Sequence, residues 1–120
     1  MRYLLMIADA ESAWDDMPES EQHAMLAEYH QFGEELEKSG AFVDAARLQP
    51  IATATSVRVR NGETVTTDGP FAETKEQFGG YYLIDVPNLD AALTWAAKIP
   101  SARIGTIEVR PLWEMDESQG

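Results

Sequence analysis

Two helix-forming segments, each flanked by short strand-forming runs, limit the folds that this sequence can adopt. The first helix is predicted to begin at Pro18 and to end at Ser39, because proline suits the first helical position and Gly40 supplies a left-handed stop. The second is predicted to follow the capping residue Asn88 and to end before Pro100. Apolar, branched and aromatic runs predict strands at residues 3–8, 41–48, 52–60, 63–67, 80–86 and 104–112.

This order of elements (β-α-β, a β-hairpin, then β-α-β) predicts a single α+β domain over residues 1–120. We expect a ferredoxin-like antiparallel sheet with two helices on one face. The predicted elements leave no helix to cover the other face, so we expect two copies to pair through it as a homodimer. Asn61-Gly62 is a two-residue hairpin signal, which predicts that Arg60 faces Glu63 across the turn.

The periodicity of each helix predicts which side chains face the core. At about 100° per residue, one narrow face of the first helix holds Met25, Tyr29, Phe32 and Leu36. The opposite side holds His23, His30 and Glu34, and we expect it to be solvated or to contact a second copy. In the second helix the predicted inner stripe consists of Leu89, Ala92, Leu93 and Ala96.

Composition excludes several kinds of function. The chain has 120 residues, no cysteine and a formal net charge of −12. Thiolate catalysis, thiolate metal sites and disulfides are therefore excluded, and a surface this acidic repels nucleic acid and anionic lipid. The apolar run at residues 1–8 is too short to span a membrane and acidic residues follow it, so we expect a cytoplasmic protein.

A family likeness is carried by the segment Asp68-Gly69-Pro70-Phe71-Ala72-Glu73-Thr74-Lys75-Glu76 and by Gly79-Gly80-Tyr81-Tyr82-Leu83-Ile84 after it. Further matches are Tyr3-Leu4-Leu5, Leu48-Gln49-Pro50 and Glu108-Val109-Arg110-Pro111-Leu112. The chain resembles the YCII-related family, in the subgroup named for its Asp-Gly-Pro-Phe motif. The resemblance covers nearly the whole chain and implies a dimeric α+β barrel of ferredoxin-like subunits. It also implies a link to sigma factors of the extracytoplasmic-function type, beside which many relatives are encoded.

The resemblance further implies a histidine on the first helix and an aspartate near the end of the second as functional residues. In this sequence the histidine position falls near Tyr29 or His30. The aspartate position falls near Ile99, which cannot do carboxylate chemistry. That pair of residues is therefore not carried over to this chain.

The loop at residues 68–76 is the first candidate site. Its carboxylates and lysine can supply an acid, a base and an anion clamp if they converge. A structural reading also stays open, in which Asp68 bonds backbone amides and Phe71 anchors the loop in the core. We predict catalytic roles for Asp68, His30 and Tyr29, and ligand-binding roles for Phe71, Glu73, Lys75, Glu76, Tyr81 and Arg58.

Two hypotheses about function stay open. The first is a small-molecule enzyme or binding pocket at the sheet–helix or dimer interface. The second is a non-catalytic regulatory or partner-binding module associated with an extracytoplasmic-function sigma factor. No nucleotide-binding loop, zinc-protease motif or nucleophile elbow occurs in the sequence. We assign no metal site, the residues identify no cofactor or substrate, and the acidic run from Asp9 to Asp16 can be read as cation ligands or as solvated surface.

Overall fold

The computed structural model describes residues 1–70 and 72–114. Within these residues, six strands and three helices follow one another: β1 (Arg2–Asp9), α1 (Glu11–Asp15), α2 (Glu19–Ser39), β2 (Phe42–Arg47), β3 (Thr55–Arg60), β4 (Glu63–Asp68), β5 (Gln77–Asp85), α3 (Leu89–Lys98) and β6 (Thr106–Pro111). Short 3₁₀ turns cover Ile51–Thr53 and Pro100–Arg103. All predicted strands and helices are present, with ends within a few residues of the predicted ones.

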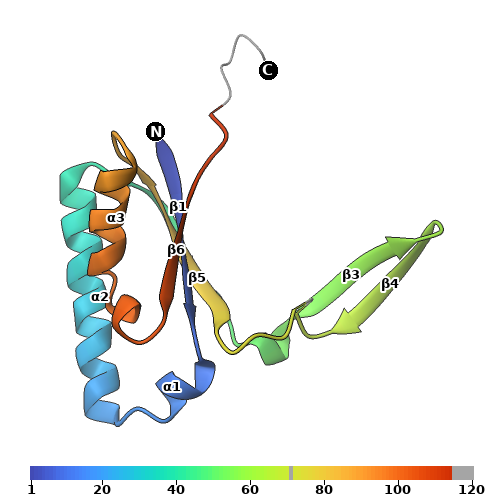
Figure 1. Cartoon of the computed structure of the whole chain (residues 1–120). Helices are drawn as coiled ribbons and strands as arrows, with labels where there is room; N and C mark the ends of the chain where they lie inside the picture. Colours follow the sequence, from blue (N-terminus) through green and yellow to red (C-terminus); the bar gives the residue numbers. More distant parts are fainter. Residues whose placement is uncertain (71, 115–120) are drawn as a thin grey trace.

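Four of the strands form one antiparallel sheet in the order β2-β5-β1-β6. Helices α2 and α3 lie together on one face of this sheet (Figure 1). Along β1, alternate residues are buried beneath the helices, namely Tyr3, Leu5 and Ile7, and Ile84 of β5 joins them in the core. This arrangement confirms the predicted α+β, ferredoxin-like antiparallel sheet with two helices on one face.

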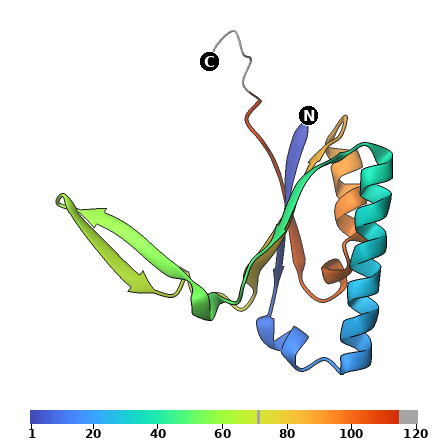
Figure 2. The same ribbon diagram turned by 180° about the vertical axis from the view of Figure 1, so that it is seen from behind.

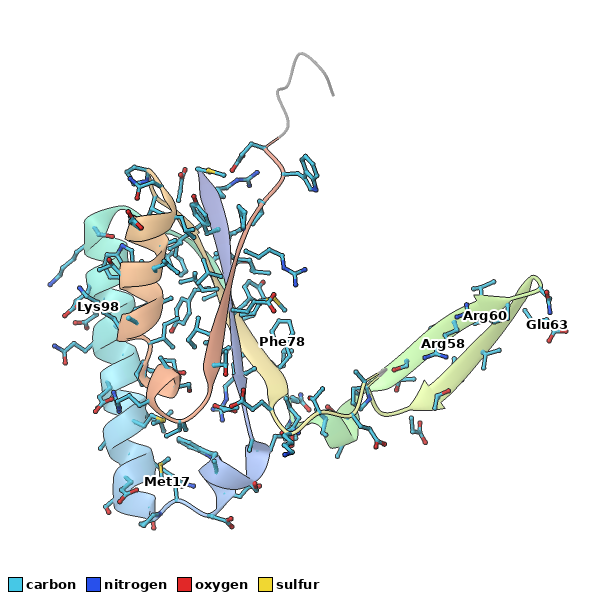
Figure 3. All side chains as sticks on the ribbon, in the orientation of Figure 1. Met17, Arg58, Arg60, Glu63, Phe78 and Lys98 are labelled. Carbon is cyan, nitrogen blue, oxygen red and sulfur yellow. The ribbon has the colours of Figure 1, made fainter. Side chains whose placement is uncertain are left out.

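The opposite face of the sheet has no helix over it in the described part of the chain, and we call it the open face. The strand register places apolar side chains at its centre and charged ones on β6, among them Leu4, Met6, Phe78, Tyr81, Leu83, Glu108 and Arg110. Figure 3 shows Phe78 on the side of the sheet that points away from the helices, where it is 41% exposed. The open face therefore has an apolar centre beside a charged edge strand.

The long helix α2 forms as its sequence predicts. Pro18 precedes it, Glu19 and Glu21 lie in its first turn, and Gly40 ends it with a φ of 82°. Its buried residues are Met25, Phe32 and Leu36, and Tyr29 packs against the same core. The prediction of this core face is confirmed.

The inner face of α3 differs from the prediction. Asn88 caps the helix as expected, accepting a hydrogen bond from the amide of Ala91 at 2.9 Å. Ala92 and Ala96 are buried, whereas the leucines of the predicted stripe, Leu89 and Leu93, are 48% and 46% exposed. Two small side chains let the helix lie close to the sheet, so the larger leucines are turned outward.

The hairpin of β3 and β4 projects from the body on the side opposite to the helices, as both views show (Figures 1 and 2). We call residues 55–68 the arm. Its turn has positive φ at Asn61 and Gly62, 52° and 78°, and Arg60 pairs with Glu63 as predicted. At its base, the amide of Gly69 donates to the carbonyl of Ala54 at 2.8 Å.

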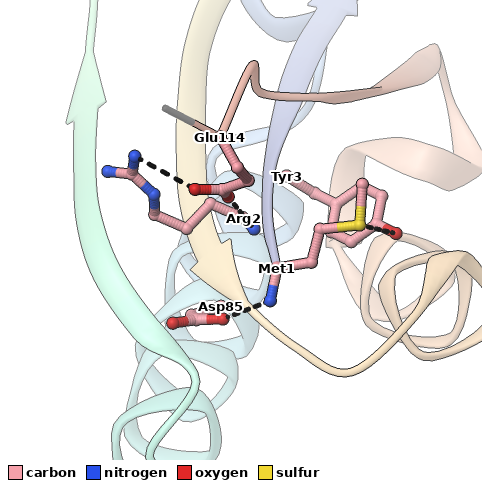
Figure 4. A network of polar contacts seen from close by, with 5 residues as sticks. All are labelled: Met1, Arg2, Tyr3, Asp85 and Glu114. Atoms are coloured by element: carbon pink, nitrogen blue, oxygen red, sulfur yellow. Dashed lines mark hydrogen bonds and ion pairs between the residues drawn. The ribbon is translucent and has the colours of Figure 1, made fainter. Parts of the chain in front are cut away.

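Polar contacts tie the start of β1 to two other parts of the chain (Figure 4). The Met1 amine pairs with Asp85 at 2.9 Å, and the amide of Arg2 donates to Oε1 of Glu114 at 2.7 Å. The backbone hydrogen bond from Arg2 lowers the pKa of the Glu114 carboxyl. These contacts hold the residues after β6 beside β1, at the end of the sheet far from α1.

Candidate functional site

A cavity of about 500 Å³ lies where α1 and α2 meet the ends of β1, β2 and β5. Its apolar walls include Ile7, Trp14, Met25, Leu26 and Pro50. Polar side chains enter it from separate elements: Asp9, Glu11, Tyr29, Arg47 and Ser101. A largely apolar hollow with a few convergent polar groups is the usual form of a small-molecule site.

A hydroxyl pair forms the most buried polar part of the cavity. The Tyr29 hydroxyl lies 2.5 Å from Oγ of Ser101, and Ser101 is only 4% exposed. The Asp9 carboxyl lies near Ser101, which acts to lower the pKa of that carboxyl. Either hydroxyl of the Tyr29–Ser101 pair can be the donor. The three side chains come together from α2, the Pro100–Arg103 turn and the end of β1.

Burial raises the pKa of three groups in this cavity. Desolvation raises the pKa of Asp9, and the carboxylates of Glu76 and Glu11 raise it further, against the lowering effects of Ser101 and Arg47. Desolvation also raises the pKa of the Tyr29 hydroxyl and raises that of Tyr82, beside it, to about 12. Asp9 is therefore a carboxyl whose protonated form is favoured by burial.

Helix α1 closes one side of the cavity, and contacts with other parts of the chain hold it there. Oε1 of Glu11 accepts from the amide of Ile51 at 2.7 Å, and the Glu11 amide donates to Gln77 at 2.9 Å. The guanidinium of Arg47 stands 5.7 Å from the centre of the Trp14 ring, within cation–π range. Arg47 is thus placed at the cavity with its charge available to an anionic group.

Replacing Asp9 by asparagine is expected to change how stability depends on pH. The folded chain holds the Asp9 proton to a higher pH than the unfolded chain does, because its folded pKa is raised above the ordinary 3.8. Wild type should therefore lose stability relative to Asp9→Asn as the pH rises from about 3.8 through that raised pKa. Urea unfolding of both proteins across this range measures the difference, and a difference independent of pH would contradict the assignment.

Three of the residues predicted from sequence belong to the cavity or act on it. Tyr29 lines it, and Tyr81 borders it, although the Tyr81 side chain lies on the open face, where its hydroxyl donates to Asp44 at 3.1 Å. Glu76 accepts a hydrogen bond from Thr106 at 2.7 Å, and its charge raises the pKa of Asp9. It is the part of the 68–76 loop that bears on the site.

The other predicted residues lie elsewhere. His30 is on the outer side of α2, 80% exposed, and pairs with Glu34 at 2.9 Å. Asp68 and Arg58 belong to the arm, and Glu73 and Lys75 are exposed and do not line the cavity. Phe71 lies outside the described residues. The structure therefore does not bring Asp68 and His30 together with Tyr29.

Sequence reasoning missed the importance of Asp9, Arg47 and Ser101. Asp9 was grouped with the acidic run, although a carboxylate at the end of a buried strand is a signal for a site. Ser101 is two residues beyond Ile99, which is itself in the core and 1% exposed. The described residues contain no group of three or more acidic or histidine side chains placed to hold a metal ion. Nor is any helix among them long and apolar enough to cross a membrane.

Comparisons with known proteins identify a family and a relative of this chain. A family model described as "YCII-related domain" matches residues 1–116. A protein of Rhizobium meliloti (strain 1021), described as uncharacterized, is 37% identical over 114 residues, which cover 93% of this chain and 92% of the relative. Both matches span the strands, the helices and the cavity described above.

Proposed function

This chain belongs to the YCII-related domain family, and we propose that it acts through the cavity between α1, α2 and the sheet. The cavity takes up a small organic molecule with an apolar body and an oxygen-bearing group, and Asp9 exchanges a proton with that group. The observation that supports this most directly is the buried Tyr29–Ser101 hydroxyl pair with the Asp9 carboxyl near it, in a largely apolar hollow.

The two kinds of lining residue suggest how such a molecule would sit. Trp14 and Leu26 offer flat apolar surface to its body. Asp9 at the end of β1 and Arg47 at the end of β2 offer a proton donor or acceptor and a positive charge to its oxygen. Burial raises the pKa of the Asp9 carboxyl, which favours the protonated form that a general acid needs.

A second copy would complement this site rather than form it. The cavity lies within one chain, whereas the open face, with Phe78 41% exposed, still needs cover. We propose that two copies pair through their open faces, which would build the dimeric α+β barrel implied by the family resemblance. In this proposal the 68–76 loop contributes to the site through Glu76, whose charge raises the pKa of Asp9.

Phenol, benzoate and toluene are suitable probes because they share an apolar ring and differ in the oxygen group. In amide NMR titrations, phenol and benzoate should shift the signals of Asp9, Trp14 and Ser101. Loss of a hydrogen bond to the bound oxygen costs on the order of 1.4 kcal/mol, so toluene should bind about tenfold more weakly. Benzoate bound beside Asp9 should also raise the pKa of the Asp9 carboxyl, measured by its carbon shift.

Matched variants separate the cavity from the rest of α2. Asp9→Asn and Ser101→Ala should weaken phenol binding by about tenfold, while His30→Ala, an exposed change on the same helix as Tyr29, should leave it unchanged. Probe shifts confined to residues outside the cavity, or full affinity in Asp9→Asn, would refute the proposal.

The second candidate is a non-catalytic module that binds a partner, with a sigma factor as the kind suggested by the family resemblance. The outer side of α2 supports it, because Glu34 and Glu37 are exposed there and would suit a basic surface. This candidate makes the opposite prediction for the same titrations: no probe enters the cavity, and an α2 charge variant such as Glu34→Lys alone abolishes capture of the partner.

A further inference from the structure

We propose that the arm, residues 55–68, is a clasp that packs against a second copy of this chain. The inference rests on the pairing of open faces proposed above and concerns a different surface. The arm touches its own body chiefly at its base, and its side chains stand away from the sheet, as the labelled Arg58, Arg60 and Glu63 show (Figure 3).

The arm lacks the cover that a β-ribbon of this kind requires. Val57, Val59 and Val65 are 61%, 59% and 46% exposed. A two-stranded ribbon alone in water is marginally stable, and it becomes stable when a further surface covers one of its faces. The exposed valines identify the arm as the part of the described chain with most to gain from a partner.

The pairing register divides the arm into two unlike faces. Val57 and Val59 lie opposite Thr66 and Thr64, so one face is apolar and β-branched. On the other face Arg58 lies opposite Val65, and Arg60 lies opposite Glu63. One face can therefore pack against apolar surface while the other presents positive charge.

The position of the arm suggests what covers it. It leaves the body on the side of the open face and away from the helices in both views (Figures 1 and 2). A second copy seated on the open face would therefore lie in the angle between sheet and arm. Because a two-fold axis makes the contact reciprocal, each copy would hold the other, and the two uncovered apolar surfaces would be buried together.

Charge favours a copy of the same chain as the partner. The formal net charge is −12, yet the central part of the arm carries Arg58 and Arg60. Neither arginine forms an ion pair with any acidic side chain in the described residues. An acidic second body supplies carboxylates to these arginines, whereas a nucleic acid would be repelled by the rest of the surface.

Two double variants with matched controls test the clasp by sedimentation velocity on the full chain. Val57→Asp with Val59→Asp should weaken dimerisation by at least about 100-fold, since it places charge where apolar surface is buried. Arg58→Glu with Arg60→Glu should weaken it by more than Lys38→Glu with Lys98→Glu. The second pair changes the net charge equally but lies on the helices, as Figure 3 shows for Lys98.

Hydrogen exchange gives an independent readout that needs no substitution. The amides of β3 and β4 should be protected at high protein concentration and lose that protection on dilution, because the isolated ribbon opens readily. If wild type is a dimer but its arm amides stay unprotected, the clasp is wrong. It is also wrong if the valine double variant dimerises as strongly as wild type. Either result would leave the pairing of open faces intact. A wild-type monomer at tens of micromolar would overturn both, without bearing on the probe titrations of the cavity.

Discussion

Gly105→Ala is expected to lower the free energy of unfolding by about 3 kcal/mol, at the upper end for overpacking, because no space exists for the added methyl group. A β-carbon at Gly105 would lie 2.2 Å from the carbonyl oxygen of Ala8 and 2.8 Å from the β-carbon of Asp9. The first atom belongs to the backbone of β1, so β6 must move away from its neighbour. The same shift would displace the Asp9 carboxyl, and the variant should lose phenol binding as well.

Two other glycines are controls for this substitution. An added β-carbon at Gly33 or Gly79 would meet no atom within 4 Å. Gly33 is inside α2, where exchange for alanine should stabilise the helix by about 1 kcal/mol. Urea denaturation measures the free energy of unfolding of the three variants. If Gly105→Ala and Gly79→Ala change it equally, the close approach of Gly105 to β1 described here is wrong.

Leu36→Ala is the second substitution with a large expected effect, a loss of roughly 3 kcal/mol of unfolding free energy. Leu36 is 0% exposed and packs in the core between α2 and the sheet. Truncation removes buried methyl groups and leaves a cavity that the surrounding strands cannot collapse to fill. The change should appear as a lower midpoint of urea unfolding with an unchanged slope.

Leu93→Ala is the same substitution in α3, and it should lower the free energy of unfolding by less than about 1 kcal/mol. Leu93 is 46% exposed, although the helical periodicity of the sequence placed it on the inner stripe. Comparable losses from Leu36→Ala and Leu93→Ala would mean that α3 is rotated relative to the orientation described here.

The elements that the sequence predicted correctly are those determined by local chemistry. Gly40 ends α2 because it adopts positive φ, Asn88 caps α3 through its side chain, and Asn61-Gly62 sets the hairpin register. The α+β fold followed from the order of these elements. The inner face of α3 did not follow, because several rotations of a short apolar helix satisfy the same periodicity and only packing against the sheet selects one.

Fewer features of the candidate site than of the fold could be predicted from the sequence. Tyr29 was identified because it lies on the core face of a long helix, and Glu76 because it lies in a charged loop. Asp9, Arg47 and Ser101 come from parts of the chain up to 92 positions apart and meet only when the ends of the strands and the Pro100–Arg103 turn are brought to one place. No short motif links such residues, so their proximity cannot be read from spacing.

The sequence by itself therefore determined the elements, their order, the turn of the arm and the acidic, cysteine-free character of the chain. Tertiary structure alone decided that Ser101 lies against Tyr29 and that the arm stands free on the open side. The physical reason is the range of the interactions. Turns and caps depend on neighbouring residues, whereas a cavity or an uncovered surface depends on how distant segments share the same space.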